Sequence, residues 1–411
     1  MRSSLRKLFF ILFVFSSLEV FSQSENPQSG RTIELVESIP VETTLDNPNI
    51  RNTPEVWLEM INTAKYNIDI EQFYITSEKG ELLEGILNAL VGAAERGVKI
   101  RILVDSKMYV TYPDDVNRLE QQSPNIIKHV IDFGRLAGGI QHAKFFIVDE
   151  SEIFIGSQNF DWRAMNHIHE LGVRVKEPDI AYLYSALFDS DWDYSEKNDN
   201  ESWKNFYMPK AGLLNTHLTD SYYGSVILTP TMSPPPFISI ENFQDERKLL
   251  EMIDSAKDEV CLQFLTYKTS LKEGGIFSLD SALVNAASRG VKVKLIVSDW
   301  SIGEYAIKDL QRLAGINNIE VKYNSIPEWS GGHLPFARVE HCKYAAVDNN
   351  ICWIGTANAE KSYFRNSRNV GVVIDNGKIS SEVKDIFMKD WNGSYTYYIT
   401  PGGNYTPRKK E

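Results

Sequence analysis

The chain has little cysteine and no excess of positive charge. Its 411 residues include three cysteines, Cys261, Cys342 and Cys352, and none of them forms a CxxC pair. This spacing excludes a disulfide framework and a cysteine-based zinc site, although it allows one bridge. The formal net charge of −12 argues against a protein that coats duplex nucleic acid through a broad basic face. An enzyme whose site alone is basic is compatible with this charge.

Long hydrophobic runs are also lacking. The most apolar segment, LFFILFVFSSLEVF, is short and contains Glu19, so it is a poor membrane span. It follows a basic start, MRSSLRK, and ends with VFS before Gln23. We therefore predict a secretory signal peptide over residues 1–22, with an uncleaved N-terminal anchor as the alternative. Both place the body of the protein outside the cytosol, in a secreted or periplasmic location.

An internal repeat organises the rest of the chain, whose length predicts two domains or one domain of two lobes. The segment AAERGVKIRILVD at 93–105 matches AASRGVKVKLIVSD at 286–299. Each has the pattern of a helix end, a terminating glycine and a β-branched strand. The repeat predicts an α/β protein in which two strand–helix–strand lobes are joined in one chain.

A polar motif recurs in both halves within apolar surroundings. Its spacing, H-x-K-x4-D, is the same in both copies, and a G-[ST]-x-N sequence follows each. The histidine and lysine are two residues apart, so on a strand they project from the same face. A satisfied core histidine would explain one copy but not two. The members are His142, Lys144, Asp149, Gly156, Ser157 and Asn159, and then His341, Lys343, Asp348, Gly355, Thr356 and Asn358.

The doubled motif resembles the hallmark of the phospholipase D superfamily, and the resemblance covers nearly all of residues 45–395. The segments SQNFDWRAMNHIHELGV and SPPP are similar to the branch of endolysosomal 5′-exonucleases and related secreted and viral envelope proteins. The resemblance implies two pseudo-symmetric lobes, each a mixed β-sheet flanked by helices, with both motifs at the interface. We expect a first lobe at 45–217, an irregular Pro- and Ser-rich linker at 218–237, a second lobe at 238–398 and a disordered tail at 399–411.

The motif residues provide what cleavage of a phosphodiester requires. A neutral imidazole can attack phosphorus and form a phosphohistidine, while an imidazolium protonates the leaving oxygen. Lys144 and Lys343 would supply fixed charge, and Asn159 and Asn358 amide donors, around the phosphoryl group. This chemistry needs no metal and no other cofactor, as the resemblance also implies.

The two copies differ eleven residues after the motif asparagine, where the first has Glu170 and the second has Asn369. In the family, an acidic residue near this place orients the motif histidine. If Glu170 does so for His142, then His142 is the nucleophile and His341 the general acid, and this is our expectation. Structural roles are expected for Asp149, Ser157, Asp348 and Thr356.

Residues that follow each motif are candidates for contact with the substrate. Trp162 can stack on a base and Arg163 can pair with a phosphate; the alternative is a helix start packed on the core. The same alternatives hold for Tyr363, Phe364 and Arg365. His167 and His169 suggest a metal pair, but surface or pocket-wall positions are the favoured interpretation. His333, in a Gly-rich loop, is interpreted as an exposed loop residue.

Two substrate classes fit this chemistry. The favoured function is a 5′-exonuclease acting on single-stranded nucleic acid. The alternative is a phospholipase D or transphosphatidylase acting on glycerophospholipids, which the acidic balance and the lack of a clear amphipathic membrane helix disfavour. Intact motifs in both halves disfavour a non-catalytic binding protein. The resemblance also allows a homodimer.

Overall fold

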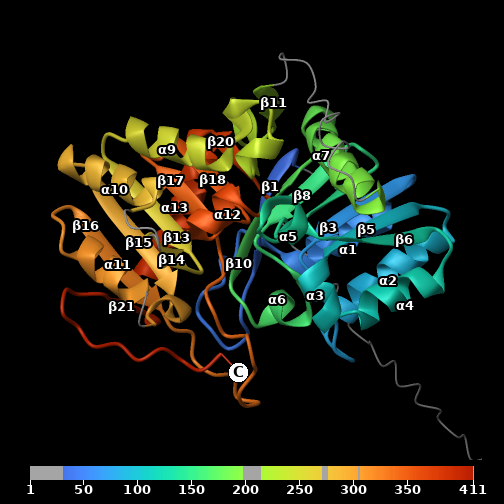
Figure 1. Cartoon of the computed structure of the whole chain (residues 1–411), viewed down its shortest axis with the longest axis horizontal. Coiled ribbons are helices and arrows are strands. Elements are labelled where there is room, and N and C mark those ends of the chain that lie inside the picture. Colours follow the sequence, from blue (N-terminus) through green and yellow to red (C-terminus); the bar gives the residue numbers. More distant parts are fainter. Residues whose placement is uncertain (1–30, 198–213, 271–275, 304–305, 411) are drawn as a thin grey trace, which may run out of the picture.

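The computed structural model describes residues 31–197, 214–270, 276–303 and 306–410. Two α/β lobes lie side by side in this part of the chain (Figure 1), the first in blue to green and the second in yellow to red. Within the described ranges no helix is both long and apolar enough to cross a membrane. The segment predicted as a signal peptide, 1–22, lies outside the described residues.

The first lobe is built on an eight-stranded mixed sheet with helices on both faces. Its central strands are buried along their whole length, as in β7 with the sequence FFIV, because both faces of the sheet are covered. In sheet order the strands are β2 (Arg51–Asn52), β1 (Ile33–Ser38), β10 (Glu170–Val175), β8 (Glu152–Gly156), β7 (Phe145–Val148), β3 (Asn67–Gln72), β5 (Lys99–Asp105) and β6 (Ile126–Ile131). The helices are α1 (Thr53–Thr63), α2 (Leu82–Glu95), α3 (Ser106–Thr111), α4 (Asp114–Gln122), α5 (Phe133–Ala137), α6 (Trp162–Asn166) and α7 (Pro178–Lys197).

The second lobe repeats this plan on a nine-stranded sheet. In sheet order the strands are β11 (Thr216–Asp220), β12 (Gly224–Ser233), β20 (Asn369–Asp375), β18 (Ile351–Gly355), β17 (Tyr344–Val347), β13 (Glu259–Phe264), β15 (Lys292–Ser298), β16 (Ile319–Asn324) and β21 (Thr396–Tyr398). The α-helices are α9 (Asp245–Ser255), α10 (Ser278–Ser288), α11 (Ala306–Ala314), α12 (Lys361–Arg365) and α13 (Gly377–Asn392), and short 3-10 turns span Pro235–Phe237, Glu241–Phe243 and Asp299–Ser301. Two small two-stranded sheets pair β4 (Ile75–Thr76) with β9 (Phe160–Asp161) and β14 (Tyr267–Lys268) with β19 (Ala359–Glu360).

The two lobes share one topology. The order β10-β8-β7-β3-β5-β6 in the first corresponds to β20-β18-β17-β13-β15-β16 in the second. In both, the last three strands are mutually parallel, and the first strand of the motif-bearing hairpin, β7 or β17, is antiparallel to them. The predicted fold class, two pseudo-symmetric α/β lobes with mixed sheets, is confirmed.

A shared hydrophobic core joins the lobes. One cluster of buried side chains includes Phe145 and Tyr184 from the first lobe with Ile354, Val372 and Ile386 from the second. Separate clusters fill each lobe on the other side of its sheet. Because α7 and α13 both contribute to the shared cluster, the interface is packed like a protein interior, and residues placed on it are held in fixed positions.

Two expected boundaries differ from the structure. The segment predicted as an irregular linker, 218–237, consists largely of β11 and β12, which pair with each other, and β12 also pairs with β20. The Pro- and Ser-rich composition that suggested a linker is concentrated at its end, where β12 stops at Ser233. The first sheet also begins before residue 45, because β1 pairs with β10 along its whole length.

The C-terminal segment 399–410, predicted to be disordered, lacks regular secondary structure but packs on the second lobe. The N–H of Phe336 donates to the carbonyl of Lys410 at 2.8 Å, and the guanidinium of Arg408 donates to the carbonyl of Arg338 at 3.2 Å. The ammonium of Lys410 lies over the ring of Trp300 at 4.8 Å. Cation–π and backbone contacts thus hold a sequence whose composition is typical of disorder.

Candidate active site

Both motif copies reach the lobe interface as extended segments just before β7 and β17. The N–H of His142 donates to the carbonyl of Arg368, and the N–H of His341 donates to the carbonyl of His169, each at 2.9 Å. Each motif therefore forms a short parallel bridge with the opposite lobe. The two histidines are 4% and 7% exposed, so the structure gathers both copies in one buried site.

His142 is oriented by the second lobe. Its Nδ1 lies 3.0 Å from Oδ1 of Asn369, the first residue of β20. The amide of Asn369 is itself fixed, because its Nδ2 donates to the carbonyl of Tyr363 at 2.7 Å and the hydroxyl of Thr356 donates to its Oδ1 at 3.1 Å. An amide oxygen only accepts hydrogen bonds, which assigns the proton to Nδ1 of His142 and leaves Nε2 for chemistry.

His341 is oriented by the first lobe, through a carboxylate. Its Nδ1 lies 2.7 Å from Oε2 of Glu170, the first residue of β10. The expectation that Glu170 orients His142 of its own motif is therefore wrong. The bridge between His169 and Glu340 aligns the start of β10 with the opposite motif, so the side chain of Glu170 points across the interface. The assignment of His142 as nucleophile loses the support of the expected pairing and retains only that of the family resemblance.

The motif lysines are buried beside the histidines. Nζ of Lys144 donates to the carbonyl of His142 at 2.8 Å, and Nζ of Lys343 donates to the carbonyl of His341. Burial lowers the pKa of Lys343 to about 8, against the opposing effect of Glu170. Burial and the charge of Lys343 lower the pKa of Lys144 well below its ordinary value. Two buried ammonium groups beside the histidines are suited to bind a phosphoryl group, whose negative charge favours their protonated form.

Burial disfavours the charged forms of the two histidines and of Glu170. Burial lowers the pKa of His142 and of His341 well below the ordinary value, and the two lysines lower it further. Burial raises the pKa of Glu170 well above its ordinary value, although Lys343 opposes this shift. The positive charges of the lysines repel a proton on either imidazole. An anion bound between the lysines offsets this repulsion, so substrate binding favours protonation of an imidazole.

The G-[ST]-x-N sequences fix the turns behind the site. The N–H of Leu171 donates to the hydroxyl of Ser157 at 3.0 Å, and the N–H of Val370 donates to the hydroxyl of Thr356 at 3.1 Å. These bonds secure the residues next to Glu170 and Asn369. Asn159 and Asn358 are 7% and 2% exposed, and within the described residues their Oδ1 atoms have no hydrogen-bond partner.

The motif aspartates lie at the tips of the two hairpins. Asp149 accepts the N–H groups of Lys65, Tyr66 and Asn67 at 2.7 to 3.0 Å. Asp348 accepts those of Lys257, Asp258 and Glu259 at 2.7 to 2.9 Å. Both have a positive φ of 52°, a conformation that aspartate tolerates better than most residues. Each aspartate therefore ties its hairpin to the loop before the central strand.

Of the five residues predicted to contact substrate, Tyr363 lies at the histidines. Its ring is edge-on to His142, with centroids 4.8 Å apart. Phe364 is 1% exposed in the core of the second lobe, and Arg365 on α12 forms an ion pair with Glu246 at 2.6 Å. Core packing, the alternative interpretation, describes Phe364, whereas Arg365 is an exposed residue at the end of α12.

The corresponding residues of the first lobe also have other partners. Arg163 is 7% exposed, and its guanidinium forms an ion pair with Asp161 at 2.7 Å. Trp162 packs at the edge of the first-lobe core and lies edge-on to His167 at 5.7 Å. A buried guanidinium that is already paired is a poor candidate for phosphate binding, so the prediction for Arg163 is not supported.

The three further histidines considered in the sequence analysis occupy different environments. His169 is fully buried, and its Nδ1 is 2.6 Å from Oε2 of Glu340, so a surface position is wrong for it. His167 is 3% exposed and its ring lies edge-on to Trp329 at 5.2 Å. His333 lies in an exposed loop, 3.6 Å from Glu328. The three cysteines are buried and unbridged.

Sequence reasoning missed two neighbours of His142. Phe73 lies edge-on to the imidazole with centroids 5.1 Å apart, and the ammonium of Lys144 is 5.3 Å from the centre of its ring. Asn369 was noted only as the residue that replaces a glutamate. The repeat contained a signal for its role, because Asn369 and Glu170 hold equivalent places and an orienting group for one motif implies one for the other.

Two buried imidazoles, each with Nδ1 held and Nε2 available, between two lysines define a site for phosphodiester chemistry. The chain matches the family model described as "Cardiolipin synthase, PLD-like domain" over residues 57–192 and 249–391. It belongs to the phospholipase D superfamily, as the doubled motif predicted, and is an enzyme of phosphodiesterase type.

Several characterised proteins are similar to the chain over most of its length. Phospholipase D Z of Dictyostelium discoideum is 30% identical over 394 residues, which is 90% of this chain and 92% of that protein. The virion nicking-joining enzyme of Vaccinia virus is 29% identical over 395 residues, 91% of each chain. The 5′-3′ exonuclease PLD3 of Macaca fascicularis is 27% identical over 420 residues, 94% of this chain and 85% of that protein.

A solved structure shares the fold. The phosphatidylserine synthase of Haemophilus influenzae superposes with a TM-score of 0.62 at 12% identity and covers 89% of this chain and 87% of its own. At this identity the likeness shows the two-lobed architecture alone.

Proposed function

We propose that the protein is a metal-independent 5′-exonuclease that cleaves single-stranded nucleic acid through a phosphohistidine. The observation that carries the proposal is the crossed orientation of the two histidines, one held by a carboxylate and one by a neutral amide. This difference gives chemically distinct roles to residues that the repeat makes equivalent. Both roles use side chains of this chain alone.

His341 is the nucleophile in this proposal, and His142 is the general acid. Nε2 of His341 attacks phosphorus, and Glu170 stabilises the positive charge that develops on the ring as the N–P bond forms. The P–O bond to the leaving group breaks, and His142 donates its Nε2 proton to the departing oxygen. His142 then takes a proton from water as the water attacks phosphorus and the N–P bond breaks. Lys144 and Lys343 stabilise the phosphoryl oxygens in both steps.

Two observations support nucleic acid as the substrate. Phe73 and Tyr363 flank His142 with aromatic rings, and aromatic side chains are the usual stacking partners of unpaired bases. Two of the similar proteins are named as nucleic-acid enzymes, the exonuclease and the nicking-joining enzyme. The similarity to Phospholipase D Z supports phospholipid as a second candidate substrate.

The test is digestion of single-stranded oligonucleotides labelled at either end, with EDTA present, between pH 5 and 8. We expect stepwise loss from the 5′ end by the wild type and none by His142→Ala or His341→Ala. His217→Ala, at an exposed histidine of β11, is the matched control and should match the wild type. Release of choline from phosphatidylcholine without nucleolysis would replace the nuclease by the lipid enzyme. Dependence on a divalent ion would contradict the mechanism.

We also propose that the protein acts outside the cytosol, secreted or periplasmic. The support is the basic start and the short apolar run of residues 1–22. Intact mass of the protein recovered from cell fractions tests this. A mass lacking residues 1–22 in the extracytosolic fraction is expected, whereas a full-length cytosolic chain would contradict the proposal.

A further inference from the structure

A second layer of buried polar side chains lies behind the catalytic residues. It is formed by the residue that precedes each histidine and each orienting residue in the chain. Successive side chains of an extended segment point to opposite faces, so these four side chains point away from the substrate. They are Gln141, His169, Glu340 and Arg368, and none has any exposed surface.

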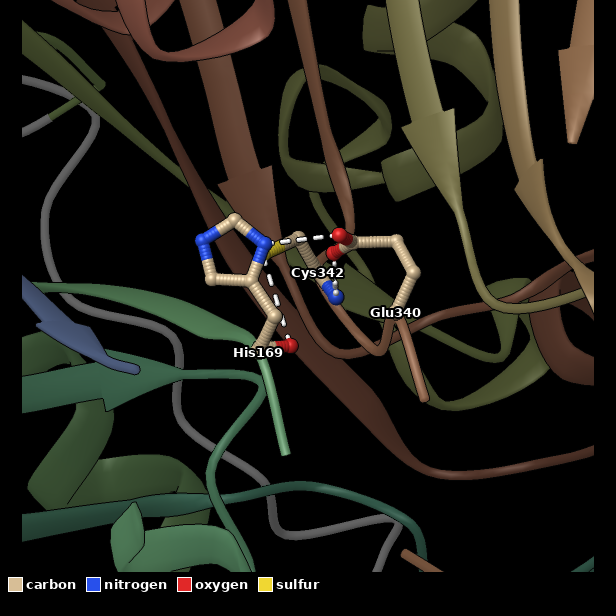
Figure 2. Close-up of side chains that lie close together, drawn as sticks. All are labelled: His169, Glu340 and Cys342. Carbon is tan, nitrogen blue, oxygen red and sulfur yellow. Dashed lines mark hydrogen bonds and ion pairs between the residues drawn. The ribbon is translucent and has the colours of Figure 1, made fainter. Parts of the chain in front are cut away.

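On the side of the second lobe this layer is centred on His169, which the first lobe contributes. Its Nδ1 lies 2.6 Å from Oε2 of Glu340 and 3.6 Å from Oδ2 of Asp390. Figure 2 shows the imidazole facing the carboxylate of Glu340, with the thiol of Cys342 beside them. Nε2 of Gln263 donates to Oδ2 of Asp390 at 2.9 Å.

On the side of the first lobe the layer is centred on an ion pair between Asp191 and Arg368, which the second lobe contributes. Nε of Arg368 lies 2.8 Å from Oδ2 of Asp191, and Nη2 donates to Oδ1 of the same residue at 3.1 Å. Nε2 of Gln141 donates to Oε1 of Glu71 at 3.0 Å. Both networks connect the lobe interface to a carboxylate on a long helix, Asp191 on α7 and Asp390 on α13.

The two networks are equivalent by position. The motif histidines are 199 positions apart (341 minus 142), and the same separation relates His169 to Arg368, Gln141 to Glu340 and Asp191 to Asp390. Glu71 and Gln263 hold the same place on β3 and β13, each opposite the first residue of the motif strand.

The exchange between these positions keeps the set of side-chain types the same in both networks. Each network has one basic side chain, two carboxylates and one amide. Where the first lobe has the amide of Gln141, the second has the carboxylate of Glu340, and where the first has the carboxylate of Glu71, the second has the amide of Gln263. In this correspondence, the imidazole of His169 holds the place of the guanidinium of Arg368.

We propose that His169 is a positioning residue that is held as an imidazolium and does for the second lobe what the guanidinium of Arg368 does for the first. Its charge holds Glu340 and Asp390 together and thereby fixes the two backbones that carry Glu170 and His341. The inference rests on the proposed roles of Glu170 and His341 and extends them to the layer behind.

The electrostatics agree with this role. Burial lowers the pKa of His169, but Glu340 and Asp390, with a contribution from Glu37, outweigh burial and raise it to about 10. The remaining titratable neighbour, Cys342, stays a neutral thiol because burial raises its pKa well above the ordinary value. The imidazolium therefore faces carboxylates and no cation among these neighbours.

Three residues of this network also have side chains that could ligate a metal. The comparison of the two lobes argues against a metal site. His169, Glu340 and Cys342 place ligand atoms within 4.8 Å of one another. However, Nδ1 of His169 is at hydrogen-bonding distance from Glu340, and its counterpart Arg368 is a guanidinium, which does not ligate metals. Ligation by Cys342 would also require its thiolate, which buried carboxylate neighbours disfavour.

The first test measures the protonation state of His169 in the wild-type chain. The full chain labelled with 15N-histidine is titrated from pH 6 to 9 by NMR, and His169→Gln identifies the signal. We expect the doubly protonated 15N pattern of His169 to persist to pH 9. A neutral ring at pH 7, or one metal ion per chain by elemental analysis with a metal-bound nitrogen shift, would overturn the proposal.

The second test uses kinetics on bis(p-nitrophenyl) phosphate, a simple phosphodiester. His169→Gln should lower kcat by on the order of tenfold to a hundredfold with little change in KM, while the matched control His167→Gln should not. A variant with the first-lobe network, His169→Arg, Glu340→Gln, Gln263→Glu and Cys342→Ala (the residue equivalent to Ala143), should restore most of kcat.

Unchanged kcat in a folded His169→Gln would overturn the proposal, and if the fourfold variant does not fold, the NMR titration still decides. Neither readout uses nucleic acid. Failure to digest oligonucleotides therefore refutes the proposed substrate and leaves the role of His169 to these two measurements.

Discussion

The two halves of the molecule have nearly the same backbone plan and different chemistry at a few places. In both, a motif histidine is held at Nδ1 by the first residue of a strand from the other lobe. The holding group is the amide of Asn369 on one side and the carboxylate of Glu170 on the other. The flanking residues differ too, since Phe73 and Tyr363 beside His142 correspond in sequence to Leu265 and Ala164. The internal repeat thus sets the backbone arrangement of the site, and differences at single positions give the two histidines different surroundings.

Removal of either motif histidine tests this division of tasks most strongly. His341→Ala should lower kcat by roughly 10⁴-fold or more on any phosphodiester, because no covalent intermediate can form. His142→Ala should be equally inactive on oligonucleotides but partly active on bis(p-nitrophenyl) phosphate, whose leaving group needs no proton.

Trapping of 32P on the chain from labelled bis(p-nitrophenyl) phosphate, with denaturation in alkali to preserve the acid-labile N–P bond, gives a direct check. We expect label on wild type and on His142→Ala, but not on His341→Ala. The opposite pattern of labelling would reverse the two roles.

Exchange of the orienting groups should have the next largest effect. Glu170→Gln makes both sides alike and should lower kcat about a thousandfold, as expected when an orienting carboxylate is lost. Asn369→Asp also makes both sides alike, and a carboxylate beside His142 should raise its pKa and move the basic limb of the pH–rate profile upward. Equal, small effects of the two changes on kcat and pH profile would show that the difference between the halves has no chemical role.

The aromatic side of the site should affect binding more than chemistry. Tyr363→Ala gives the second lobe the residue that the first lobe has at 164 and should raise KM for a single strand about tenfold, since stacking contributes roughly 1–3 kcal/mol per base. Tyr363→Phe is the conservative control. A fall in kcat with unchanged KM would instead place Tyr363 in the chemical step.

The hairpin aspartates should show the smallest effect and no difference between the halves. Asp149→Ala and Asp348→Ala each leave three backbone N–H groups without an acceptor and should each cost about 1–3 kcal/mol of unfolding free energy. Burial raises the pKa of Asp348, but the N–H donors outweigh it and lower the pKa below the ordinary value of 3.8. Its contribution to stability is therefore present above that pH and is lost as the pH falls through the lowered pKa.

Urea titrations of both variants at pH 7 and pH 3 measure this effect, with kcat as the control. A large loss of activity without loss of stability would place an aspartate in catalysis.

The repeat and the doubled motif predicted the fold and the core of the site, because both are encoded in local spacing. The partner of each histidine was not predictable in this way. Glu170 lies 28 residues after His142 in sequence but points to His341, and that choice depends on how two strand entries align across the interface. Likewise Arg163 looked available for phosphate, yet Asp161 two residues earlier takes its guanidinium. The strands at 216–233 were mistaken for a linker because prolines at their end dominated the composition.

The crossed orientation of the histidines has a consequence for biosynthesis. His142 is translated long before Asn369, and its ring has no orienting partner until β20 has been made and has docked on the first lobe. A growing or truncated chain that ends before β20 therefore carries a complete first motif without a working catalyst. We therefore expect catalytic activity only when synthesis is almost finished, because the residue that orients His142 is translated near the end of the chain.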